Sequence, residues 1–237
     1  MAMERVSTGV KALDELVQGG FPAGSTILLK GSPGSYKTIL SLHFLFAGAQ
    51  KGEKGLYITF NQGADKIKMQ GEQLGMKFEG IPLEFISFDT SKDTDIEAGV
   101  VNAIKESGAK RVVMDSLSSY LSKPPLMPSQ HHADPIYNAI KEFPGLNVSE
   151  DMFVRALTTR LLRRISEVDS TILFIYESQT MDTVGATCEY LVDGVVKLNR
   201  VEAIGKRTLT VEKMRYTKHD FLPRTMKLEN GNVQIVK

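Results

Sequence analysis

The sequence has 237 residues, of which 42% are apolar, so it is long enough to bury the core of one large domain. Its 29 basic and 28 acidic residues nearly balance, which excludes a strong overall attraction to nucleic acid or to an anionic membrane. The one cysteine, Cys188, excludes an internal disulfide. We find neither a signal-peptide pattern nor an apolar run near the roughly 20 residues that span a bilayer, and we expect a cytoplasmic protein without a membrane segment.

Apolar strands and amphipathic helices alternate through the first half of the chain. Residues 25–30 form a short apolar run between two glycines, as in a buried strand of a parallel sheet. Helical spacing follows at once, and the alternation then predicts strands at 55–60, 83–88 and 111–115 and helices at 66–74 and 96–107. Strands that alternate with helices are joined by right-handed crossovers, so we predict an α/β fold with a mainly parallel central sheet covered by helices.

The alternation stops after residue 115, where residues from about 122 to 148 are rich in proline. Such a segment predicts an irregular excursion within one domain that covers residues 1–237. Beyond it, a helix is predicted from Ser149, followed by strands at 171–176, 194–198, 207–214, 225–228 and 233–236. An Asn-Gly turn separates the last two strands, which predicts a hairpin. We therefore expect C-terminal antiparallel strands to extend the parallel sheet.

A candidate phosphate-binding loop lies between the first predicted strand and the helix after it. The loop consists of Gly31, Ser32, Pro33, Gly34, Ser35, Tyr36, Lys37 and Thr38. Backbone N–H groups at such a helix start can surround phosphates, a lysine neutralises their charge, and a threonine hydroxyl coordinates Mg²⁺. Lys37 and Thr38 stand at the positions for these two roles.

The loop departs from the usual pattern at Tyr36, where a glycine normally lets the backbone approach the phosphates. A side chain here either points away from the nucleotide or fills space near it. We expect weaker nucleotide binding than in an intact loop. The alternative is a vestigial loop that binds no nucleotide.

A single carboxylate ends the apolar strand predicted at 111–115. Ligands bind at the carboxyl ends of parallel strands, where Asp115 could hold the same Mg²⁺ as Thr38 through water. Many strands end in aspartate because a turn follows, so the interpretation depends on its combination with Lys37 and Thr38.

With these residues in place, the chain resembles the KaiC-like branch of the RecA superfamily of P-loop ATPases over nearly its whole length. The segments that carry the resemblance are 7–9, 13–16, 19–24, 55–60, 112–117, 193–196 and 213–219. The last of them, Lys-Met-Arg-Tyr-Thr-Lys-His, is the most specific. The resemblance implies a RecA-like fold, ATP or ADP with Mg²⁺, and a ring-shaped homo-oligomer, expected to be a hexamer.

The resemblance also implies that Lys213, Arg215 and His219 reach the nucleotide of the neighbouring subunit. Residues two apart on a strand share a face, so Lys213 and Arg215 are expected to point the same way. The alternative is a charged edge strand exposed to water.

The chain departs from the family at the catalytic step. Asn61 and Gln62 occupy the positions of two adjacent glutamates that polarise the attacking water. An amide can orient water but cannot accept its proton at neutral pH. With Tyr36, these two amides predict weak or absent ATP hydrolysis, unless Glu177 or Asp89 takes over the role.

We therefore expect a regulatory or scaffolding ATP- or ADP-binding protein. One alternative is a DNA-stimulated ATPase that binds single-stranded DNA, suggested by four arginines on the helix after residue 149, although such charges more often form a solvated face. These are Arg155, Arg160, Arg163 and Arg164. Another alternative is a nucleotide-free interaction module in which Tyr36 plugs the loop.

Overall fold

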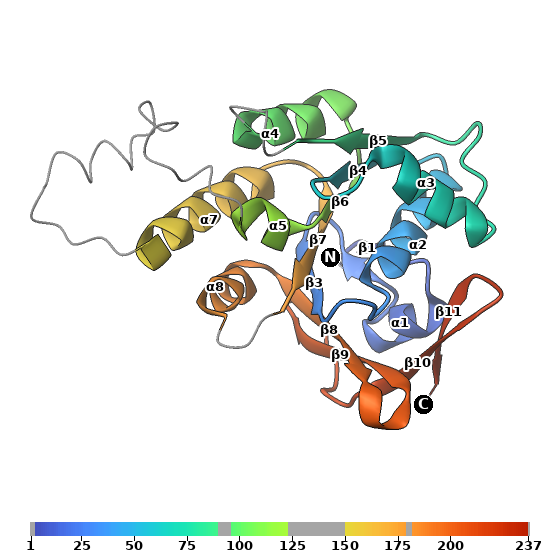
Figure 1. Cartoon of the computed structure of the whole chain (residues 1–237). Coiled ribbons are helices and arrows are strands. Elements are labelled where there is room, and N and C mark those ends of the chain that lie inside the picture. The colour runs from blue at the N-terminus through green and yellow to red at the C-terminus, as the bar shows by residue number, and fades with distance from the viewer. Residues whose placement is uncertain (1–2, 90–95, 123–149, 179–181, 237) are drawn as a thin grey trace, which may run out of the picture.

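A nine-stranded sheet forms the centre of the computed structural model, which describes residues 3–89, 96–122, 150–178 and 182–236 (Figure 1). The order of its strands is β11-β10-β9-β8-β3-β7-β6-β4-β5. The strands are β3 (Thr26–Gly31), β4 (Gly55–Thr59), β5 (Leu83–Ser87), β6 (Arg111–Asp115), β7 (Thr171–Glu177), β8 (Gly194–Val201), β9 (Lys206–Met214), β10 (Arg224–Glu229) and β11 (Asn232–Val236). A separate small sheet pairs β1 (Arg5–Val6) with β2 (Phe21–Pro22).

The direction of the strands confirms the predicted fold class. β3 lies between β7 and β8 and is parallel to both, and β6, β4 and β5 continue the parallel part of the sheet. β9, β10 and β11 extend the other side as antiparallel strands. All six residues of β3 are buried, as expected for a central strand that is covered on both faces.

Helices cover both faces of the sheet in two groups. They are α1 (Lys11–Leu16), α2 (Lys37–Ala49), α3 (Ala64–Gln73), α4 (Ile96–Ser107), α5 (Leu117–Ser122), α7 (Glu150–Ser166) and α8 (Thr183–Leu191), with a 3₁₀ turn at Glu202–Ile204. Ile27 and Leu29 pack in the cluster that includes residues of α1, α2 and α3, whereas Leu28 packs in the cluster that includes residues of α4, α7 and α8. Successive side chains of a strand point to opposite faces, so one strand supplies both cores.

Short elements account for most differences from the sequence prediction. α1, α5 and α8 were not predicted, and they have 6, 6 and 9 residues. Elements this short hold too few apolar repeats to define a period. The predicted proline-rich excursion lies almost wholly outside the described residues. No helix that the structure describes is both long and apolar enough to cross a membrane.

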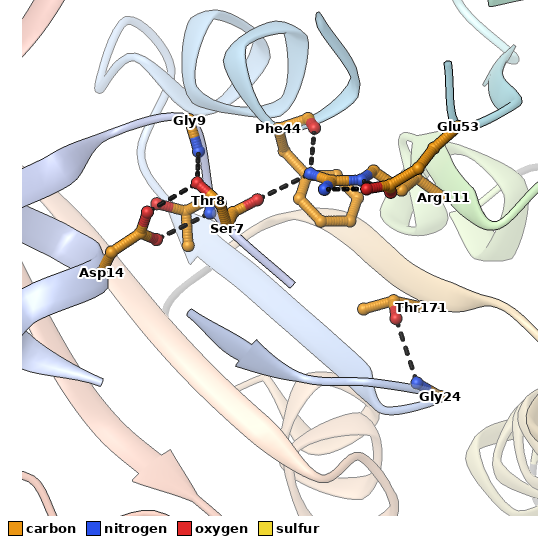
Figure 2. Close-up of polar contacts among 9 residues, drawn as sticks. All are labelled: Ser7, Thr8, Gly9, Asp14, Gly24, Phe44, Glu53, Arg111 and Thr171. Carbon is orange, nitrogen blue, oxygen red and sulfur yellow. Dashed lines mark hydrogen bonds and ion pairs between the residues drawn. The ribbon is translucent and has the colours of Figure 1, made fainter. Parts of the chain in front are cut away.

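A buried arginine connects the sheet to the N-terminal segment at the amino edge of the parallel strands (Figure 2). The side chain of Arg111 on β6 is 1% exposed, and its Nε and Nη2 atoms donate to both carboxylate oxygens of Glu53, at 2.6 and 3.2 Å. Its Nη1 atom donates to the carbonyl oxygens of Ser7 and Phe44, and its guanidinium lies 5.1 Å from the centre of the Phe44 ring. Every part of this buried cation therefore has a partner.

The same N-terminal segment is held by one carboxylate of α1. Asp14 accepts hydrogen bonds from the Ser7 hydroxyl, at 2.6 Å, and from the Thr8 backbone N–H, at 2.7 Å (Figure 2). Nearby, the Thr171 hydroxyl accepts a hydrogen bond from the Gly24 N–H, which joins the start of β7 to the turn before β3. These contacts give structural roles to segments 7–9, 13–16 and 19–24, which are among those that carry the family resemblance.

Candidate nucleotide-binding site

The candidate phosphate loop connects β3 to α2 at the carboxyl edge of the parallel strands. β3 can approach β8 closely at this point because a side chain is absent: a Cβ atom on Gly31 would lie 1.9 Å from the carbonyl oxygen of Leu198. α2 then begins at Lys37, directly after the loop. The predicted strand-loop-helix context is thus present, with the start of a helix next to the loop where backbone N–H groups lack partners in the helix.

The ammonium of Lys37 lies inside the loop. Its Nζ atom donates to the carbonyl oxygens of Gly31 and Ser32, at 2.8 Å each, and the residue is only 6% exposed. Burial lowers the pKa of Lys37, and the negative charges of Glu177 and Asp115 oppose this shift. Two neutral carbonyls compensate a buried cation only in part, so an anion in the loop would be stabilised.

Thr38 and Asp115 lie together, as the sequence predicted. The Thr38 hydroxyl donates to Oδ2 of Asp115 at 3.1 Å, and the hydroxyl of Tyr57 on β4 donates to the same atom at 2.5 Å. Burial raises the pKa of Asp115, while the two hydroxyl donors and the charge of Lys37 oppose the rise. The pKa of Tyr57 is raised by burial and by the neighbouring carboxylate, which keeps its hydroxyl a donor.

These oxygens fit a magnesium ion. Mg²⁺ prefers a small number of hard oxygen ligands together with water and phosphate oxygens. The Thr38 hydroxyl and the Asp115 carboxylate supply two such oxygens beside the phosphate loop, and the Lys37 ammonium would neutralise phosphate charge next to them. A bound ion would supply charge neutralisation for the phosphates, and the chain's own residues would orient them.

Tyr36 occupies a left-handed backbone conformation at the start of α2, with φ 75° and ψ 19°. Its ring packs against the core cluster that includes residues of α2, and the guanidinium of Arg207 on β9 lies over it, 4.2 Å from the ring centre. The Nε atom of Arg207 also donates to the Gly34 carbonyl at 2.8 Å. The Tyr36 ring thus has partners outside the loop, and the Lys37 ammonium is bound to the carbonyls of Gly31 and Ser32.

Asn61 and Gln62 follow β4 at the same edge of the sheet and are exposed. β4 pairs with β6 so that Thr59 lies opposite Asp115, which places the loop after β4 next to the candidate metal ligands. The Asn61 side chain donates to the Ser119 hydroxyl, and the Thr59 hydroxyl donates to the Gln62 carbonyl. The two amides thus follow the strand next to the candidate metal ligands, at positions where the resemblance implies carboxylates.

Of the two alternative carboxylates, only Glu177 lies near the phosphate loop. It ends β7 opposite Gly31 in the sheet register, and its backbone N–H donates to the Ser118 hydroxyl. Its charge acts on both Lys37 and Asp115. Asp89 instead follows β5, the last strand on that side of the sheet.

Lys213 and Arg215 lie at the opposite, amino edge of the sheet. Lys213 donates to the carbonyl oxygens of Glu189, Tyr190 and Val192 at the end of α8, at 2.8, 3.1 and 2.6 Å. Arg215 forms an ion pair with Asp193 at 3.2 Å. Both side chains thus contact the segment around the end of α8, although Arg215 lies just beyond the end of β9.

The register shows how far these two residues are from the chain's own phosphate loop. The Arg215 N–H donates to the Asp193 carbonyl, and the Asp193 N–H donates to the carbonyl of Thr26 at the start of β3. Gly31 is five residue steps along β3 from Thr26, which is about 16 Å at the usual rise of a strand. His219 lies further along the chain, where its Nδ1 atom contacts the Thr217 carbonyl and its buried Nε2 atom has no partner among the described residues.

Two of the four arginines on α7 contact a neighbouring helix. Arg160 and Arg164 both form ion pairs of 2.6 Å with Glu97 of α4, which is buried. These two guanidinium groups connect α7 to α4 across the helical layer. The two ion pairs give Arg160 and Arg164 a structural role, while Arg155, Arg163 and Arg164 are exposed, as in the solvated face that was expected.

Comparison with known proteins identifies the family. The family model described as "ATPase: KaiC" matches residues 6–237. The chain belongs to the KaiC family of ATPases. Together with the fold, this membership makes it a nucleotide-binding protein of the RecA-like P-loop class.

Individual relatives of the KaiC family align along most of the chain. UPF0273 proteins of Methanopyrus kandleri and Thermotoga maritima are each 26% identical, across 99% and 98% of this chain and 93% and 96% of their own lengths. The circadian clock oscillator protein KaiC of Prochlorococcus marinus is 28% identical across 92% of this chain, which corresponds to 43% of that protein. A solved KaiC-like protein from Pyrococcus horikoshii superposes with a TM-score of 0.77 at 24% identity, covering 100% of both chains.

Two residues of the site were missed in the sequence. Tyr57 was seen only as part of an apolar strand, although a tyrosine buried there needs a partner for its hydroxyl. Arg207 gave no signal, because it is 173 residues from Gly34, whose carbonyl it contacts. Contacts of this kind depend on which strands become neighbours in the sheet.

Proposed function

We propose that this KaiC-family protein binds ATP or ADP with Mg²⁺ at residues 31–38 and hydrolyses ATP slowly or not at all. The observation that carries the proposal is that the lysine and the two candidate metal ligands are retained, whereas the expected catalytic carboxylates are replaced. The Lys37 ammonium lies inside the loop and the Thr38 hydroxyl contacts Asp115, whereas Asn61 and Gln62 stand where the resemblance implies carboxylates. Without a carboxylate at these positions, the attacking water lacks a general base there.

We further propose that the protein forms a ring-shaped homo-oligomer, a hexamer by family resemblance, in which residues 1–237 act as one RecA-like domain. Lys213 and Arg215 lie at the sheet edge remote from their own loop, so a phosphate contact by them requires a second subunit. Large apolar side chains surround this region and are exposed. They are Tyr190, Tyr216, Phe221 and Leu222, at 79, 72, 69 and 60% exposure. Exposed aromatic residues beside arginine are typical of subunit interfaces.

Such a protein would act as a regulatory or scaffolding component. A nucleotide that bridges two subunits favours assembly, and assembly in turn raises nucleotide affinity, because the two equilibria are linked. Slow turnover would keep the bound state long-lived. We propose that the protein uses nucleotide binding to set its oligomeric state.

Titration calorimetry with Mg-ADP and Mg-ATP tests the binding claim. We expect the wild-type protein to bind, and Lys37→Ala to lose about a hundredfold or more in affinity, because a buried charged partner of the phosphates is removed. Lys227→Ala is the matched control, since Lys227 is an exposed lysine on β10. If the wild-type protein gives no heat of binding with either nucleotide, the proposal is wrong.

Light scattering of the same samples tests assembly. We expect nucleotide to increase the mass of the wild type and of the Lys227→Ala variant. Arg215→Ala is expected to lose this response while its monomer still binds nucleotide, since Arg215 lies far from its own loop. A wild-type mass that does not change with nucleotide or protein concentration would contradict the bridged ring.

Restoring the carboxylates tests the claim of slow hydrolysis. We expect Asn61→Glu with Gln62→Glu to raise ATP turnover by about a hundredfold, the usual contribution of a general base. The Glu177→Gln variant tests whether the Glu177 carboxylate supports the basal rate of ATP hydrolysis. A fall in turnover with unchanged nucleotide affinity would assign this role to Glu177. Rapid turnover by the wild type would show that the amides do not limit the reaction.

A further inference from the structure

The left-handed backbone of Tyr36 has an energetic cost that glycine would not have. A bulky residue at positive φ is uncommon, and the conformation costs about 1–2 kcal/mol for a residue with a Cβ atom. Tyr36 has φ 75° at the point where the phosphate loop becomes α2. Contacts elsewhere in the structure must therefore hold the loop in this shape.

Arg207 provides two of these contacts from a different part of the chain. Its guanidinium lies over the Tyr36 ring, 4.2 Å from the ring centre, and its Nε atom donates to the Gly34 carbonyl at 2.8 Å. One rigid, planar group thus holds both a side chain and a backbone carbonyl of the loop. Arg207 itself lies near the start of β9, paired in the sheet with Arg200 of β8, so it extends from the central sheet.

The bond to Gly34 also determines the direction of the next N–H group. In a planar trans peptide, the carbonyl and the N–H of the following residue point to opposite sides. When Arg207 holds the Gly34 carbonyl, the N–H of Ser35 is directed away from the arginine. N–H groups in this part of the loop are the ones that surround a phosphate.

We propose that Arg207 is a positioning residue. By stacking on Tyr36 and binding the Gly34 carbonyl, it holds the phosphate loop in the shape that binds the diphosphate group of a nucleotide. The inference rests on the proposed nucleotide binding at residues 31–38. It goes beyond that proposal because it names the residue that supports the left-handed conformation at position 36, which a glycine would adopt without strain. The clamp, defined as Arg207 with Tyr36, is needed only because position 36 is not glycine.

The neighbouring Arg200 distinguishes a clamp from a simple charge effect. Arg200 is on the same hairpin, and its Nη1 atom would lie 3.7 Å from a Cβ atom on Gly34. Its side chain pairs with Glu202 at 2.7 Å. Replacing Arg200 removes the same charge from nearly the same place, but it removes neither the stacking on Tyr36 nor the bond to the loop.

The first measurement uses nucleotide-free protein, so it does not depend on binding. Hydrogen exchange of peptides that cover residues 32–40 is compared among wild type, Arg207→Ala and Arg200→Ala. We expect Arg207→Ala to exchange about tenfold faster or more in this segment, and Arg200→Ala to remain within about threefold of wild type. Peptides of α4 serve as the internal control for global unfolding. Equal exchange in wild type and Arg207→Ala would overturn the clamp, whether or not nucleotide binds.

The second measurement is a double-mutant cycle on the affinity for Mg-ADP. We expect Arg207→Ala to weaken binding about tenfold in the presence of Tyr36, and by less than about threefold in a Tyr36→Gly background, because glycine needs no support at this φ. Tyr36→Phe, which keeps the ring, should retain wild-type affinity. Equal losses in both backgrounds, or an equal loss from Arg200→Ala, would overturn the proposal. If the wild type binds no nucleotide but the exchange results hold, the proposed function fails and the clamp stands.

Discussion

Two buried cations lie at opposite edges of the same parallel sheet, and their surroundings differ. Arg111, at the amino edge, has a carboxylate, two carbonyls and an aromatic ring as partners. Lys37, at the carboxyl edge, has two loop carbonyls as its hydrogen-bond partners among the residues that the structure describes. A buried cation whose charge is fully compensated stabilises the fold, whereas a buried cation whose charge is compensated only in part favours the binding of an anionic ligand. The number of partners thus distinguishes the structural cluster around Arg111 from the candidate binding site around Lys37.

The largest expected effect comes from replacing each cation with methionine, which has a similar length. We expect Arg111→Met to lower the free energy of unfolding by about 3 kcal/mol, because it leaves the Glu53 carboxylate and the carbonyls of Ser7 and Phe44 without their donor. Lys37→Met is expected to change stability by less than about 1 kcal/mol, because the lost hydrogen bonds are offset by the removal of a desolvated charge. Urea denaturation of both variants without nucleotide measures the difference. Similar losses from both would refute the distinction drawn here.

A smaller effect is expected from Asp115, the other incompletely compensated charge at the carboxyl edge. Its pKa is raised in the folded protein, mainly by burial, so the ionised side chain opposes folding at neutral pH and this cost decreases as the pH falls. Asp115→Asn removes the charge and keeps one oxygen as an acceptor for Thr38 and Tyr57. We expect the nucleotide-free variant to be more stable by about 1 kcal/mol at pH 7, within the usual range for functional residues.

Thermal unfolding of the Asp115→Asn variant at pH 7 and pH 5 provides the check. The gain in stability should be smaller at pH 5, because the wild-type carboxyl is then closer to its folded pKa. The same variant should bind Mg-ADP more weakly than wild type, since the amide is a poorer partner for a magnesium-bound water. A loss of stability at both pH values would show that the carboxylate is fully compensated in the fold.

The smallest effect is expected at His43, a buried polar residue of α2. Its Nε2 atom contacts the carbonyl oxygen of Gly231 at 3.1 Å, and burial lowers its pKa below the usual value of 6.5. Because the unfolded chain takes up this proton more readily, the stability that neutral His43 contributes is present above pH 6.5 and is lost as the pH falls below it. One proton accounts for at most about 1.4 kcal/mol per pH unit.

His43→Gln isolates this contribution, because the amide can donate to the same carbonyl without titrating. Urea unfolding between pH 7.5 and 5.5 should show a shallower decrease in stability for the variant than for the wild type. Parallel curves would mean that other groups account for the acid sensitivity.

Most of the sheet and the contents of the phosphate loop could be predicted from the sequence because their signals are local. Buried parallel strands are continuous apolar runs, and the loop lies in contiguous residues between a strand and a helix. The helix at Ile96–Ser107 and the strand at Arg111–Asp115 have the predicted bounds. The combination of Lys37, Thr38 and Asp115 was predicted because each stands at a strand end or a helix start, and parallel strands bring such ends to one edge.

The sequence by itself thus determined the fold class and the place of the candidate phosphate loop between a buried strand and a helix. Only the tertiary structure decided that Arg207 holds Tyr36, that Tyr57 donates to Asp115, and that Lys213 and Arg215 lie at the edge remote from their own loop. The physical reason is the range of the interactions. Periodicity and loop motifs act between residues close in the chain, whereas these contacts join distant strands whose neighbours are chosen by the packing of the whole sheet.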